Sequence, residues 1–246
     1  MIGSLFIVIS WTVWTVFLPL SLIGVYGFSS SKASIALISL SIGSAIGANI
    51  FGNLIGRIKL QLPIAILGFT IVGISMIISG YTNLDINFNL LLVLALIVGF
   101  GSTGAFSAYT VPIQNNLPEE KLGIITTSLQ FARVFGISLG SSLLGVILLT
   151  NMTTYNYDPP RQDLYNPDNI TSKEKILDIK KEYLEQSSLK LFEEDLEISR
   201  SNLKKGLRRV YFAASVPAFL GIIVSMIIFY KPNRRLYVEE GLEQNE

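Results

Sequence analysis

The 246-residue sequence contains no cysteine and no histidine. Disulfides, thiolate nucleophiles and Cys-ligated zinc are therefore excluded, as are the commonest metal ligand and the usual proton carrier near neutral pH. We expect no metal site, no cofactor and no catalytic residue. An enzyme is the least favoured class of function, because the long apolar runs hold no candidate acid, nucleophile or metal site.

Charge is also scarce, at 15% of residues, while 50% are hydrophobic and the mean hydropathy is +0.52. The segments 1–31 and 33–56 carry no charge at all. A water-soluble globule of this size lacks the polar surface to cover so much apolar material, whereas a lipid bilayer needs none. The net charge of +1 gives no reason to expect nucleic acid as a partner.

Six apolar runs are long enough to cross a bilayer, whose hydrocarbon core needs about 20 helical residues. The fold class predicted is therefore an all-α membrane protein of six transmembrane helices. The first run lacks the basic start and cleavage pattern of a signal peptide, so we interpret it as a span. The six runs are 4–26, 33–56, 62–81, 89–111, 122–149 and 210–230.

Basic residues in the short loops predict the orientation, because they stay on the cytoplasmic side. Six of them fall on one side of the membrane, whereas the short loops opposite offer only Lys32: Arg57, Lys59, Lys121, Lys231, Arg234 and Arg235. We expect a multi-pass protein of the cell membrane with both termini in the cytoplasm. Four bases at 204–209 argue otherwise, but they belong to a long segment, and long segments cross regardless of charge.

The chain divides into four parts on this interpretation. Residues 1–150 hold the first five spans, 151–207 form an extracytoplasmic loop with an amphipathic helix, 208–231 form the sixth span, and 232–246 form a cytoplasmic tail. The amphipathic helix is indicated by apolar residues at helical spacing: Ile176, Ile179, Tyr183, Leu184, Leu189, Phe192, Leu196 and Leu203. A solvated helical hairpin packed on the membrane domain is favoured over a binding module.

Arg133 is the one charged residue inside a predicted span, and no Asp or Glu lies within any of the six. An arginine at that depth costs a few kcal/mol on insertion scales, so it should face protein or water. Two roles stay open for it: locking helices together, or taking part in a transport cycle. A carboxylate for proton coupling is not available in these spans.

Small and aromatic residues supply the remaining candidates. Gly136 and Gly140 have the spacing that lets helix backbones approach closely. Several aromatic and amide side chains are candidates for the lining of a substrate cavity, although tryptophan and tyrosine also occur at membrane interfaces for structural reasons: Trp11, Trp14, Asn49, Phe106, Tyr109 and Gln130.

A loop and the helix that follows it carry a family resemblance. Gln114-Asn115, Pro118, Glu120 and Leu122-Gly123 fit the form QNxxPxExLG, and Arg133, Gly136 and Gly140 fit RxxGGxxG with Ile137 in place of the second glycine. This pattern resembles the major facilitator superfamily, and within it the fourteen-spanner drug/proton antiporter branch of the EmrB/QacA type. The chain is similar to the C-terminal six-helix half of such a protein.

The resemblance implies a bundle of two inverted three-helix repeats that exports amphipathic organic compounds or drugs by alternating access. It implies a second six-helix bundle as partner, either a separate chain or a second copy, which would hold the acids for proton coupling. It also implies a cytoplasmic gate loop with Gln114, Pro118 and Gly123, and a loop motif at Arg57 in which Gly56 replaces the usual Asp. The alternative is a truncated or non-transporting membrane subunit with no activity of its own.

Overall fold

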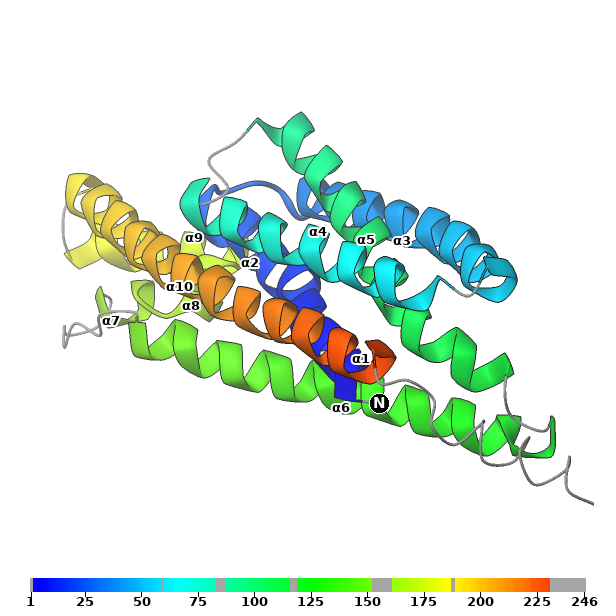
Figure 1. Ribbon diagram of the computed structural model, residues 1–246. Helices are drawn as coiled ribbons and strands as arrows, with labels where there is room; N and C mark the ends of the chain where they lie inside the picture. The colour runs from blue at the N-terminus through cyan, green and yellow to red at the C-terminus, as the bar shows by residue number, and fades with distance from the viewer. Residues whose placement is uncertain are drawn as a thin grey trace, which may run out of the picture.

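The computed structural model describes residues 2–58, 60–82, 87–115, 119–151, 161–186 and 189–230. All regular elements in these ranges are helical (Figure 1), and six helices are long and apolar enough to cross a membrane. The predicted all-α fold with six spans is therefore confirmed. The later spans are formed by α3 (Ser30–Ile58), α4 (Gln61–Thr82), α5 (Phe88–Asn115), α6 (Glu119–Asn151) and α10 (Leu189–Tyr230).

The first span is continuous but irregular. It consists of α1 (Ile2–Thr12), the π-helical segment η1 (Val13–Phe17), α2 (Leu18–Leu20) and a second π-helical segment, η2 (Ser21–Val25). Pro19 lies between the two π segments, and a proline has no backbone N–H to donate to the preceding turn. The span ends at Val25, and Gly27 just beyond it has a positive φ of 63°, a conformation that suits glycine.

The helices pair as two inverted three-helix repeats should. The first repeat contains the α1–η2 span, α3 and α4, and the second contains α5, α6 and α10. α3 packs on α5 as α6 packs on α1, and α4 packs on α5 as α10 packs on α1. α4 and α10, the third helices of the two repeats, also pack on each other.

The contact between α3 and α5 depends on glycines, which have no side chain to keep the two backbones apart. A Cβ atom at Gly43 would overlap the carbonyl oxygen of Leu96, and one at Gly99 would overlap the carbonyl oxygen of Leu40. Because the backbones meet, the Ser39 hydroxyl donates across the interface to the Leu92 carbonyl at 2.6 Å. Small residues at such a crossing gain packing contacts that a lipid environment does not otherwise supply.

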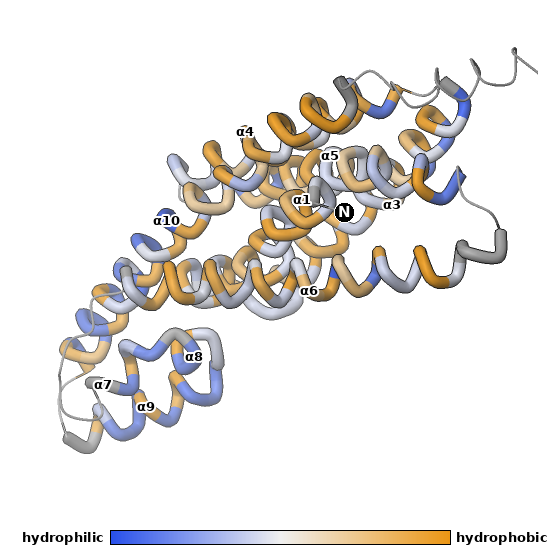
Figure 2. Tube along the Cα trace, turned by 60° about the horizontal axis from the view of Figure 1, so that its bottom comes forward, coloured by the Kyte–Doolittle hydropathy of each residue, from blue (hydrophilic) through white to orange (hydrophobic). Residues whose placement is uncertain are grey.

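Large apolar side chains cover much of the outside of the bundle. On α3 a stripe of isoleucines is 44–57% exposed, at positions 35, 38, 42, 46 and 50. The tube in Figure 2 is hydrophobic along most of the bundle and hydrophilic around α7–α9. A surface of this kind would drive aggregation in water, but it is the surface that a protein presents to lipid.

The last helix differs from its predicted start. The sixth span was expected to begin near Val210, but α10 runs without interruption from Leu189. No proline lies between Leu189 and Val210 to end a helix, so the amphipathic segment and the span join. At 1.5 Å per residue the helix is roughly 60 Å long, about twice a bilayer core, so its first half extends beyond the apolar bundle.

That first half belongs to a polar unit, which we define as α7 (Arg161–Leu164), α8 (Pro167–Ile170), α9 (Lys173–Gln186) and residues 189–207 of α10. The unit has its own small core of Leu164, Ile179, Tyr183 and Phe192. Of the apolar positions that indicated the amphipathic helix, Leu184 and Leu189 are 53% and 43% exposed.

Candidate substrate cavity

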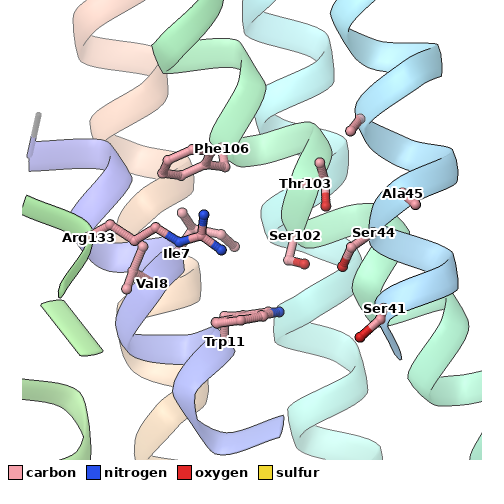
Figure 3. A pocket seen from close by; sticks show the side chains of 11 residues that line it. Ile7, Val8, Trp11, Ser41, Ser44, Ala45, Ser102, Thr103, Phe106 and Arg133 are labelled. Atoms are coloured by element: carbon pink, nitrogen blue, oxygen red, sulfur yellow. The ribbon is translucent and has the colours of Figure 1, made fainter. Parts of the chain in front are cut away.

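A cavity of about 420 Å³ lies among four of the spanning helices, within the size range of sites for drug-sized molecules. α4 and α10 contribute nothing to its wall. Figure 3 shows the lining side chains converging from α1, α3, α5 and α6. They are Ile7, Val8, Trp11, Ser41, Ser44, Ala45, Ala48, Ser102, Thr103, Phe106 and Arg133.

Arg133 supplies the charge of the cavity. Its guanidinium carbon lies 5.4 Å from the ring centroid of Trp11 and 5.4 Å from that of Phe106. The guanidinium projects between the two rings into the open space (Figure 3). Each such cation–π contact is worth about 0.5–2 kcal/mol, depending on how dry the site is, and together they offset part of the cost of placing the half-buried charge within a span.

Two glycines place this arginine. A Cβ atom at Gly136 would lie 3.1 Å from Val8 Cγ1, and one at Gly140 would lie 3.2 Å from the Cα atom of Ile9. α6 therefore approaches α1 closely just after Arg133. Because that contact brings the two helices together, the Arg133 side chain extends over Trp11 rather than into lipid.

The hydroxyl groups of the cavity are engaged with backbone. Ser102 and Thr103 each donate to the Gly99 carbonyl at 2.9 Å, and Ser44 donates to the Leu40 carbonyl at 3.0 Å. Their protons are thereby used, while their oxygen lone pairs still face the cavity as acceptors. The wall is otherwise apolar or small, which suits a ligand with an apolar body and few polar groups.

One side of the cavity is bounded by the two least buried spans. In their most apolar stretches, 28% of residues are buried in α3 and 22% in α6, against 50% in α4 and in α5. The lining residues Ser41, Ala45 and Ala48 of α3 are themselves exposed. The cavity therefore opens between α3 and α6.

The structure brings only some of the predicted cavity residues together. Trp11 and Phe106 line the cavity. Trp14 is fully buried in the core, and Tyr109 is 5% exposed and hydrogen-bonded to Ser225 at 2.6 Å. Asn49 and Gln130 are exposed and lie outside the lining.

The other candidates from the sequence lie apart from the cavity. Arg57, Gln114 and Gly123 are exposed, and a Cβ atom at Gly123 would meet nothing within 4 Å. Pro118 lies outside the described residues.

The sequence analysis did not identify the small residues of α3 that line the cavity. Ser41, Ser44, Ala45 and Ala48 recur at the spacing of one helix face, a pattern that was available in the sequence. Small residues on one face fit helix packing equally well, however, so the pattern alone does not separate a cavity from an interface.

The comparisons with known proteins point to transport. Over 132 residues, 54% of its length, the chain is 27% identical to Multidrug transporter protein MdtP of Bacillus subtilis (strain 168). Over 154 residues, 62% of its length, it is 29% identical to Multidrug resistance protein 3 of the same organism. The matched parts span only 24% and 28% of those relatives. No protein-family model matches the chain.

The class that fold and similarity define is a six-span membrane protein with distant, partial similarity to multidrug transporters. One of these relatives is a transporter by name, and the other is named for multidrug resistance. Within the described residues no group of three or more Asp and Glu side chains is placed to hold a metal ion.

Proposed function

We propose that this chain is one six-helix bundle of a secondary transporter that moves amphipathic organic compounds outward across the cell membrane. The supporting observation is the cavity among α1, α3, α5 and α6, which opens between the two least buried spans. We assign the chain to the major facilitator superfamily and to its fourteen-spanner drug/proton antiporter branch, as the C-terminal half.

A second bundle completes the transporter in this proposal. It covers the open side of the cavity, so that the two bundles enclose a site and rock about it to face each side of the membrane in turn. The six apolar runs of this chain contain no Asp or Glu, so proton coupling falls to acids of the second bundle. That bundle is a separate chain or a second copy of this one.

Counterflow exchange in proteoliposomes tests transport without requiring a proton gradient. Vesicles loaded with an unlabelled amphipathic compound should take up its labelled form in a saturable way. Ala45→Trp should abolish this exchange, because the indole fills the cavity, whereas Ile46→Trp on the adjacent, outward-facing position should leave it intact.

Loss of exchange in both variants would argue against the cavity as the site. No exchange with any compound, from a chain that is folded and inserted, would favour the alternative of a subunit without transport activity of its own.

The orientation is testable because the native chain has no cysteine. With both termini in the cytoplasm, a membrane-impermeant maleimide should label Ser172→Cys on intact cells but label Arg57→Cys only after lysis. Arg57 is exposed and Ser172 is half-buried. The reverse labelling pattern would mean that the topology is inverted, with the termini outside the cell and the loop of residues 151–207 in the cytoplasm.

A further inference from the structure

The positive charge of Arg133 in the cavity has no counterion in the described part of the chain. Among the described residues, Arg133 has no ion pair and no hydrogen bond, and no acid lines the cavity. The rings of Trp11 and Phe106 lie on either side of its guanidinium, each with its centroid 5.4 Å from the guanidinium carbon. A guanidinium carries five N–H donors, and since no described residue accepts a hydrogen bond from them, they are available to a ligand.

Apart from the indole N–H of Trp11, the remaining polar groups of the lining do not compete with Arg133 for an anion. The hydroxyls of Ser44, Ser102 and Thr103 have already donated their protons to backbone carbonyls. Carboxylates and sulfonates need donors, and a guanidinium edge offers two parallel N–H groups in the geometry that an oxyanion accepts. Arg133 is therefore the anchor for a negatively charged group.

The rest of the wall fits the remainder of such a ligand. Ile7, Val8, Ala45 and Ala48 give apolar contact, and the rings of Trp11 and Phe106 flank the charged group. A cationic ligand of the same shape would meet the uncompensated positive charge of Arg133.

We propose that the cavity selects amphipathic anions, with an aromatic or alicyclic body and one carboxylate or sulfonate group, over neutral and cationic amphiphiles. This inference rests on the proposed role of the cavity as the substrate site. It narrows the substrate class, and it assigns Arg133 as the residue that recognises the anion.

Three probes with one fluorophore isolate the effect of charge: dansylglycine as the anion, dansylamide as the neutral compound and dansylcadaverine as the cation. The chain has two tryptophans, of which Trp11 lines the cavity and Trp14 lies in the core. In the full-length Trp14→Phe variant, energy transfer from Trp11 to the dansyl group reports binding in the cavity. A Trp11→Phe, Trp14→Phe variant gives the background from direct excitation of the dye and from tyrosine.

The expected order of affinity is anion, then neutral compound, then cation, with about tenfold between anion and cation. Arg133→Gln should bring the affinity for dansylglycine down to that for dansylamide, and Arg133→Lys should keep part of the difference. The preference order of the Trp14→Phe protein alone tests the inference if the Arg133 variants do not fold.

Failure of the inference is distinguishable from failure of the proposed function. Equal or tighter binding of the cation would overturn anion selection, while counterflow exchange would still support a transporter. Exchange without binding of dansylglycine would also overturn it. If there is neither binding nor exchange, the proposed function itself fails.

Discussion

The membrane bundle and the polar unit are held together by different means, although α10 runs through both. In the bundle, α3 and α5 meet where Gly43 and Gly99 bring backbone against backbone. In the polar unit, a small core of large side chains surrounds a buried carboxylate, Asp195, which is 2% exposed.

The difference follows from the solvent of each region. Lipid tails are as apolar as leucine, so helices in a bilayer gain little from burying large side chains and associate through close backbone packing. Helices in water gain about 25 cal/mol for each Å² of apolar surface buried, which favours bulky residues at their contacts. The same chain shows both solutions.

The largest effect is expected from filling the glycine contact of the bundle. Gly43→Val would force a side chain into the Leu96 carbonyl, where backbone cannot yield, so we expect a loss of at least about 3 kcal/mol and little folded protein. Size-exclusion chromatography and thermal unfolding in detergent measure it. Gly52→Val on the same helix is the matched control, because a Cβ atom there meets nothing within 4 Å. An equal loss of stability in both variants would mean that close backbone packing does not distinguish the bundle from the polar unit.

An intermediate effect is expected in the polar unit. The Tyr183 hydroxyl donates to Asp195 Oδ2 at 3.0 Å, and removing one bond to a buried charged group costs about 1.5–3 kcal/mol. Tyr183→Phe should therefore speed hydrogen exchange in α9 while the fluorescence of Trp11 and Trp14, both in the bundle, stays unchanged. Leu184→Ala, at an exposed neighbour, should change neither. A fluorescence change in Tyr183→Phe would mean that the two regions unfold together.

The smallest effect is expected from a hydrogen bond between spans. Ser225→Ala removes the 2.6 Å contact with the Tyr109 hydroxyl, which joins α10 to α5. Side-chain hydrogen bonds between transmembrane helices average about 0.6 kcal/mol, so a detergent unfolding titration should shift only slightly. Ser34→Ala, whose hydroxyl bonds within its own helix, sets the baseline. A loss as large as that of Gly43→Val would show that polar contacts rather than backbone packing hold the bundle.

The limits of the first five spans were predictable because charged or turn-forming residues bound each apolar run. The sequence did not show that the helix of the sixth span already begins at Leu189, since polarity marks the edge of a bilayer and does not end a helix. Arg133 was identifiable as unusual from its depth alone. Its position between Trp11 and Phe106 was not, because those residues come from three different helices.

Trp14 and Tyr109 show where sequence reasoning reaches its limit. Both are aromatic residues within spans, as Trp11 and Phe106 are, and composition does not separate the pairs. Trp11 and Trp14 lie three residues apart on the same span, yet one faces the cavity and the other is buried. The rotation of each helix about its axis decides between these outcomes.

By itself, the sequence determined that lipid surrounds the apolar helices and how many times the chain crosses the membrane, because long uncharged runs are stable only where lipid replaces water. The tertiary structure alone decided which face of each helix lines the cavity. That choice depends on where backbones touch, at Gly43 and Gly99 and again at Gly136 and Gly140, and these contacts fix the rotation of the helices that carry the cavity side chains.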